Sequence, residues 1–150
     1  MTLRVASPVS GRVVPLTEVP DPVFAQAMVG PGIAVEPDRG AAEVVAPVDG
    51  TVVTLHPHAF VVATSDGAAV LVHLGIDTVK RKGEGFTLHV VKGEAVRAGQ
   101  SIVTWDPAEI EAAGYAPICP VIALDASADA LLDQADGSVA AGDDLFSWQL

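Results

Sequence analysis

The sequence is poor in cysteine and in basic side chains. Its 150 residues include one cysteine, Cys119, which excludes a disulfide framework within the chain. Eight Lys and Arg stand against 19 Asp and Glu, so the net charge is -11 at pH 7. This charge repels nucleic acid and anionic membrane surfaces, and we therefore expect protein partners that carry a basic patch and no nucleic-acid partner.

Long apolar runs are also absent. No run approaches the ~20 residues that span a bilayer, and the first residues lack the charged and then apolar pattern of a secretory signal. We therefore expect a cytoplasmic protein without a direct membrane anchor. Half of the residues are hydrophobic, which is enough to bury one core, so residues 1–150 are predicted to form a single domain.

Short apolar segments separated by glycine and proline predict an all-β fold, an antiparallel β-sandwich or barrel hybrid with a few short helices. Residues 5–14 recur as residues 44–53, and both segments contain Pro-Val-x-Gly followed, one residue later, by two valines. Residues 96–105 recur less closely as residues 139–148. The two repeats predict an internal duplication with pseudo-twofold architecture.

Three segments have the pattern of short helices. Asp21 and Asp106 are each followed by proline, which is typical of a helix cap and first helical residue, and Gly30 and Gly114 are expected to end these helices. A third helix is predicted over residues 128–134, capped by Asp125 or Ser127, with its pair of leucines against a sheet.

The stretch from His56 to Val79 carries the strongest local pattern. Val61 to Thr64 and Ala68 to Val72 are apolar and β-branched, which predicts two strands. Asp66-Gly67 between them is a favoured two-residue type I′ turn. The sequence therefore predicts a β-hairpin with Ser65 opposite Ala68.

The register of this hairpin decides which side chains share a face. With the two-residue turn, Phe60 lies opposite His73 and His58 lies opposite Gly75. Opposite residues are roughly 5 Å apart at Cβ and diagonal ones roughly 7–8 Å apart, so His58 and His73 can reach one small group. A three-residue loop would place the two histidines on opposite faces. The side chains predicted to share the face are His56, His58, His73 and Asp77.

This cluster is hard to explain by packing, because each imidazole brings polar nitrogens into apolar surroundings. One possible chemistry is zinc binding, with His56, His58 and His73 as three ligands and an open position for water. A second interpretation, hydrolysis with a histidine as the base, is less favoured, because no Ser or Cys stands in a nucleophile-elbow context. The third is phosphoryl carriage, in which one neutral imidazole attacks phosphorus and a neighbouring N–H stabilises the charged oxygens.

Residues 67–79 resemble the phosphohistidine signature of the glucose-type enzyme IIA (EIIA type 1) of the bacterial phosphoenolpyruvate:sugar phosphotransferase system. The resemblance covers essentially the whole chain. Five further segments are similar to that family in order and spacing, namely residues 19–25, 30–34, 46–50, 58–60 and 82–86.

The resemblance implies a function and roles for individual residues. It implies a phosphotransferase-system phosphocarrier without a cofactor, which accepts a phosphoryl group from HPr and passes it to the IIB domain of a sugar permease. His73 is similar to the phosphorylated histidine, and His58 to the second histidine that stabilises the phosphoryl group. Asp21 and Asp77 resemble an acidic rim that meets arginines of HPr. The implied fold is an antiparallel β-sandwich with a duplicated motif.

The same hairpin register predicts an apolar docking face around the histidines, inside that rim. Its expected members are Phe60, Val62 and Leu71.

His56 stands where many members of that family have threonine, so it is a possible additional site residue whose role is open. The alternative is a zinc-binding module or zinc hydrolase, because some peptidoglycan endopeptidases resemble this fold and use His-x-x-x-Asp with His-x-His. Both strings occur here, at residues 73–77 and 56–58, in the reverse chain order. His89 is interpreted as a surface or strand-end residue, and Cys119 as a buried small hydrophobe.

Overall fold

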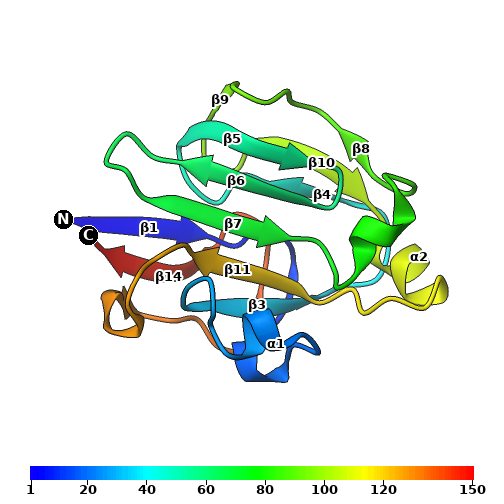
Figure 1. Cartoon of the computed structure of the whole chain (residues 1–150), viewed down its shortest axis with the longest axis horizontal. Coiled ribbons are helices and arrows are strands. Elements are labelled where there is room, and N and C mark those ends of the chain that lie inside the picture. The colour runs from blue at the N-terminus through cyan, green and yellow to red at the C-terminus, as the bar shows by residue number, and fades with distance from the viewer.

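The protein is described by a computed structural model that covers residues 1–150. An eight-stranded antiparallel sheet has the order β13-β2-β3-β11-β7-β6-β5-β9, and two three-stranded sheets have the orders β1-β14-β12 and β4-β10-β8 (Figure 1). The predicted all-β antiparallel sandwich is confirmed, and the sheets do not close into a barrel. The strands are β1 (Thr2–Ala6), β2 (Gly11–Val14), β3 (Gly32–Pro37), β4 (Ala42–Val45), β5 (Gly50–His56), β6 (Ala59–Ala63), β7 (Ala69–His73), β8 (Thr87–Leu88), β9 (Ala95–Val96), β10 (Ser101–Trp105), β11 (Cys119–Ala123), β12 (Leu131–Leu132), β13 (Ser138–Val139) and β14 (Asp144–Gln149).

Two clusters of buried hydrophobic residues stabilise the packing of these sheets. A cluster of 27 buried residues lies between the layers and includes Trp105, Phe60 and Phe146, each at most 2% exposed. A second cluster of 8 buried residues covers the other face of the large sheet, where Ile122 meets Phe24 from α1 (Pro22–Ala25). β11 is therefore buried on both faces, whereas in the neighbouring β7 the residues Ala69, Leu71 and His73 stay partly exposed.

The backbone hydrogen bonds confirm the internal duplication. The N–H of Ala6 donates to the carbonyl of Pro47 at 2.9 Å, and at the equivalent repeat positions the N–H of Val45 donates to the carbonyl of Pro8 at 2.9 Å. In the same way β1 pairs with β14 as β4 pairs with β10, and β2 pairs with β13 as β5 pairs with β9. Each half of this pseudo-twofold structure thus contains one copy of each sequence repeat.

The starts of two of the three predicted helices are confirmed, because their caps are local. The expected end at Gly30 is wrong, since α1 already ends at Ala25. The carboxylate of Asp21 accepts a hydrogen bond from the N–H of Val23 at 2.9 Å and starts α1. Asp106 caps α2 (Pro107–Ala112) in the same way. The structure also has 3-10 turns η1 (Leu16–Glu18), η2 (Thr78–Arg81) and η3 (Ala128–Ala130).

The third helix prediction is wrong beyond Ala130. Ser127 makes no side-chain capping bond, and only the single turn η3 forms. Leu131 and Leu132 instead form β12, which pairs with β14, and this places Leu131 in the main core at 7% exposure. Pairing with an existing strand therefore outweighs the weak local preference for helix.

The predicted two-residue turn between β6 and β7 is also wrong. The N–H of Thr64 donates to the carbonyl of Ala68 at 2.8 Å, so the loop has three residues, 65–67. Gly67 has φ +87°, the left-handed conformation that ends a three-residue hairpin loop. The register consequently moves by one residue, and His73 lies opposite Ala59 rather than Phe60.

The remaining sequence expectations concern Cys119 and membrane spans. Cys119 is a free, fully buried residue of β11, as expected, and burial raises the pKa of its thiol. No helix in the structure has the length and apolar character needed to cross a membrane.

The loop that follows β7 is packed tightly around Gly75. The hydroxyl of Thr78 donates to the carbonyl of Leu74 at 2.8 Å, and the N–H of Ile76 donates to the carbonyl of Ala116 at 2.9 Å. Gly75 has φ +82°, and a Cβ atom there would lie 2.8 Å from the side chain of Thr78 and 2.9 Å from the carbonyl oxygen of Ala116.

We expect Gly75→Ala to lower the free energy of unfolding by about 2–4 kcal/mol, because left-handed strain and overpacking add. Gly67→Ala is the matched control, since Gly67 has φ +87° with no atom within 4 Å of the added Cβ. Strain alone should cost that variant about 1–2 kcal/mol. Urea unfolding of both variants measures the difference, and equal losses would show that the crowding at Gly75 has no energetic effect.

Candidate functional site

Three histidines meet where β5, β6 and β7 come to one end of the sheet. His56, the last residue of β5, pairs with Ala59, and Ala59 pairs in turn with His73, the last residue of β7. Paired residues share a face, so His56 and His73 flank the small side chain of Ala59. His58 lies in the two-residue turn between β5 and β6, outside the strand alternation.

The turn brings the ring of His58 between the other two rings. The carbonyl of His58 accepts a hydrogen bond from the N–H of Leu74 at 2.7 Å, which ties the turn to the end of β7. The ring centroids of His58 and His73 are 5.3 Å apart at 74°, and those of His56 and His58 are 5.7 Å apart at 25°. The predicted convergence of the three histidines is therefore present, although it arises from the turn and not from the predicted register.

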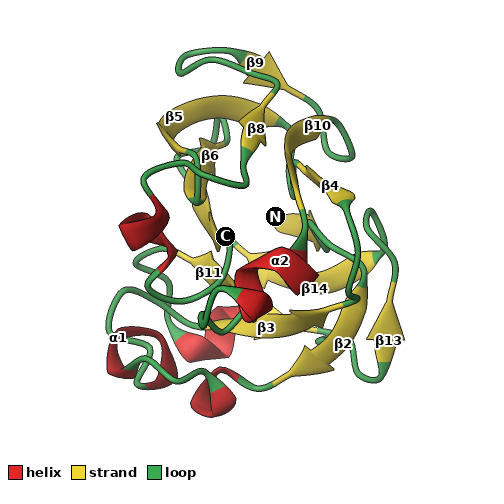
Figure 2. Cartoon of the chain, turned by 90° about the vertical axis from the view of Figure 1, so that its right-hand side faces the viewer, coloured by secondary structure: helices red, strands yellow, loops and turns green.

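The site lies at the end of the molecule away from the chain termini. In Figure 1, β5 and β7 end at the right, whereas the termini lie at the left. Figure 2 looks onto that right-hand end, with α2 near the viewer. The carbonyl of Met1 accepts a hydrogen bond from the N–H of Leu150 at 2.8 Å, so the two termini are held together.

The ring of His73 is fixed by a single hydrogen bond. Its Nδ1 is 2.5 Å from the carbonyl oxygen of Gly75. A carbonyl oxygen can only accept, so Nδ1 carries the proton and Nε2 of the neutral ring keeps its lone pair. The ring also contacts Phe24, with centroids 5.1 Å apart.

The protonation state of His73 follows from its surroundings. Burial lowers the pKa of His73, and this effect exceeds the opposing effects of the Gly75 bond and of the charges on Asp21 and Asp77. His73 is therefore neutral at pH 7, with Nε2 available as a nucleophile.

His58 combines a low basicity with a free ring. Its pKa is lowered to about 4, chiefly by burial and then by the charges of His73 and His56. Neither ring nitrogen of His58 makes a hydrogen bond within the chain. Among the histidine rings, only those of His73 and His89 form hydrogen bonds. A neutral ring keeps one N–H donor, and that donor is free for a group placed beside His73.

Asp21 and Asp77 come from two elements that approach His73 from different segments of the chain. Asp21 caps α1, and Asp77 has φ 62° at the start of η2. Both carboxylates raise the pKa of His73 through their charge. The structure therefore places both aspartates near enough to His73 for their charges to act on its ring.

The expected apolar docking face is only partly correct. Phe60 and Val62 point into the main core and are 1% and 0% exposed, so they do not face the histidines. The shifted register is the cause, since Leu71 and Val61 now lie on the face of His73. Phe24 is the contact that sequence reasoning missed, because nothing in the hairpin indicates which distant segment covers it.

No group of three or more His, Cys, Asp or Glu residues in the structure could hold a metal ion. The zinc interpretation of His56, His58 and His73 is therefore unsupported. His89 is exposed and bonds to Thr104, with 2.6 Å between Nε2 and the hydroxyl oxygen.

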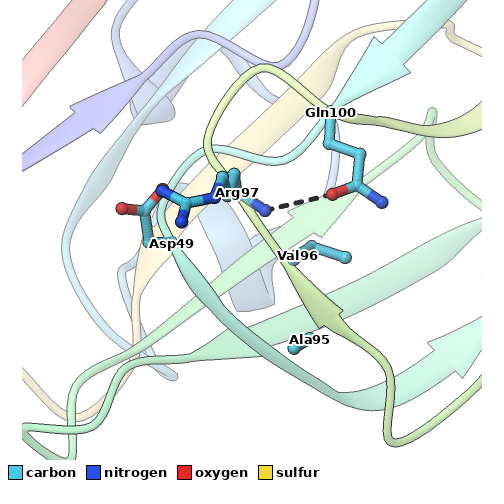
Figure 3. Close-up of a pocket in the computed structure, with 5 residues that line it drawn as sticks. All are labelled: Asp49, Ala95, Val96, Arg97 and Gln100. Carbon is cyan, nitrogen blue, oxygen red and sulfur yellow. Dashed lines mark hydrogen bonds between the residues drawn. The ribbon is translucent and has the colours of Figure 1, made fainter.

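A surface hollow near β9 contains no histidine and lies apart from the site (Figure 3). Its polar groups satisfy the local turn, because Asp49 accepts a hydrogen bond from the N–H of Ala98 at 2.7 Å and Gln100 accepts one from the N–H of Arg97 at 3.2 Å. The oxygens of Asp49 and Gln100 are therefore used in holding the local turn. The hollow is lined by Asp49, Ala95, Val96, Arg97 and Gln100.

The sequence and structure were compared with known proteins. The chain is 46% identical over 122 residues to a PTS system glucose-specific EIIA component of Oceanobacillus iheyensis, covering 80% of this chain and 73% of that protein. It is 50% identical over 116 residues to a PTS system glucose-specific EIICBA component of Streptococcus pneumoniae, covering 76% of this chain and 16% of that protein. The chain thus spans under a fifth of the length of this longer relative.

The fold has a solved counterpart. The glucose permease IIA of Mycoplasma capricolum superposes with a TM-score of 0.89 at 33% identity, covering 98% of this chain and 96% of that one. The family model for the phosphoenolpyruvate-dependent sugar phosphotransferase system, EIIA 1, matches residues 3–128. The chain belongs to this EIIA 1 family and is a phosphocarrier component of the sugar phosphotransferase system.

Proposed function

We propose that this chain carries its phosphoryl group on Nε2 of His73, receives it from phosphorylated HPr and passes it to a cysteine on the IIB domain of a sugar permease. The observation that carries the proposal is the hydrogen bond from Nδ1 of His73 to the carbonyl of Gly75. It assigns the lone pair to the other nitrogen, on a ring that burial keeps neutral.

Each transfer is a displacement at phosphorus that needs no further reactant. In the first, the lone pair of Nε2 forms an N–P bond while the N–P bond of the donor histidine breaks and its electron pair returns to the donor ring. In the second, a cysteine thiolate forms an S–P bond and the N–P bond to His73 breaks. Both steps depend mainly on positioning and on the charge of the oxygens in transit.

His58 is proposed to stabilise that charge. Its ring centroid is 5.3 Å from that of His73, and its nitrogens make no bond within the chain. The neutral ring donates one N–H to a phosphoryl oxygen, and the two negative charges of a bound phosphoryl group favour protonation of the ring. His58 thus acts on the group being transferred and is not itself phosphorylated.

The surface around the histidines suits a basic partner. Asp21 and Asp77 supply a negative rim, and the net charge of the chain is -11. Exposed apolar side chains neighbour both aspartates in sequence, with Val23 at 40% and Val79 at 59% exposure. An apolar centre with a charged rim is the usual anatomy of a transient interface.

The proposed acceptor is supported by the parts that a relative carries in one chain. The matched protein of Streptococcus pneumoniae is named an EIICBA component, so it carries its EIIA part in the same chain as B and C parts. We propose that this chain meets the corresponding parts of a permease in the cytoplasm. The zinc hydrolase alternative has no observation in its favour.

Incubation with phosphorylated HPr should label the protein once, with a bond that is labile in acid and stable in base. His73→Ala should abolish the label, because it removes the nucleophile. His89→Ala is the matched control, since it removes an exposed histidine outside the site and should leave labelling unchanged. Mass spectrometry with radioactive phosphate counts the groups transferred, and a labelled His73→Ala variant would refute the proposal.

Replacing Asp21 and Asp77 together by asparagine should slow association with HPr by about threefold to tenfold at low salt and flatten its salt dependence, because rim charges act mainly on the on-rate. Asparagine caps helices as well as aspartate, so α1 should persist. The control is Asp66→Asn with Asp136→Asn, which changes the net charge equally at two exposed positions outside the site. Stopped-flow association decides the matter, and equal rates for the two double variants would contradict local steering.

A further inference from the structure

His58 has few groups that fix its ring. It lies in a two-residue turn, and neither ring nitrogen bonds to another part of the chain. Only the main-chain bond from Leu74 to the carbonyl of His58 anchors the residue. N–H donors lie in the plane of the imidazole, so the tilt of the ring decides where its proton points. The orientation of His58 therefore depends on the rings beside it.

His56 provides the more regular of these ring contacts. Its ring lies 25° from the plane of His58 with centroids 5.7 Å apart, a stacked arrangement, whereas the ring of His73 meets His58 at 74°. His56 is the last residue of β5, and its pairing with Ala59 fixes its backbone. The stack thus connects the turn residue His58 to the sheet.

The surroundings of His56 argue against a direct chemical role. Its side chain is exposed, and no hydrogen bond orients either ring nitrogen. A nucleophile needs the orientation that Gly75 gives to His73, and His56 lacks it. Metal binding with the other two histidines is unsupported, as described above.

We propose that His56 is a positioning residue that acts through His58, holding its ring by stacking so that its N–H meets the phosphoryl group on His73. This inference rests on the proposed function. It assigns a role to a position where the aromatic ring matters and the ionisable nitrogens do not. The contribution should be larger in transfer to the acceptor, where charge must be stabilised as the group leaves His73.

The test compares rates of transfer from labelled protein to a purified IIB domain. His56→Val removes the ring and keeps a residue that suits a strand, and we expect a rate about tenfold lower than wild type. His56→Phe keeps a stacking ring without its nitrogens and should stay within about twofold of wild type. In a His58→Ala background, His56→Val should have no further effect, because a residue that acts through His58 loses its effect with it. His89→Ala is the control for loss of an exposed histidine.

Three results would overturn the inference: a wild-type rate for His56→Val, a Phe variant as slow as the Val variant, or the same loss in the His58→Ala background. Urea unfolding of each variant separates a folding defect from a transfer defect. His56→Thr also removes the ring and suits a strand, so it repeats the test if His56→Val unfolds. Failure of the wild-type protein to accept phosphate at His73 would refute the proposed function itself. If the wild-type protein is labelled normally and His56→Val transfers the group at the wild-type rate, only the role of His56 is refuted.

Discussion

The site depends on the register in which β6 lies between β5 and β7. This register sets Ala59 opposite both His56 and His73, and its small side chain leaves room between the two rings. The pairing of β5 with β6 ends at Ala59, so His58 lies in the turn between these strands. Its ring lies next to that of His73. A shift by one residue would exchange the two faces of β6 and bring Phe60 out of the main core. Packing of the main core therefore fixes the geometry of the histidines.

Burial at this sheet end also sets the chemistry. Both His58 and His73 have lowered pKa values, and burial is the largest cause for each. In the proposed transfer, a neutral His73 with its proton held on Nδ1 serves as the nucleophile, and a neutral His58 keeps an N–H donor for the phosphoryl group. The aspartates nearby oppose the shift of His73 without cancelling it. The duplicated sandwich thus supplies the frame of the site. Its polar groups come from three short segments: the end of β5 with the turn that follows, the end of β7 with the loop that follows, and the start of α1.

The sequence predicted the features that depend on neighbouring residues. The Asp-Pro starts of α1 and α2 and the two repeats follow from local composition or direct similarity, and both are present. The hairpin register was wrong because a three-residue loop with Gly67 in the left-handed conformation also fits Ser-Asp-Gly. The histidines converge despite that error, since the Pro57-His58 turn interrupts the alternation. The contact of Phe24 with His73 joins segments far apart in the chain, and no local pattern specifies it.

The central claim is that the bond between Nδ1 of His73 and the carbonyl of Gly75 directs phosphorylation to Nε2. NMR spectroscopy of protein with nitrogen-15 in its histidines, phosphorylated through HPr, measures this directly from phosphorus–nitrogen coupling. The account predicts that the phosphoryl group couples to Nε2 of His73, while Nδ1 remains protonated and bonded. Coupling to Nδ1 of His73, or to a nitrogen of His56 or His58, would contradict it.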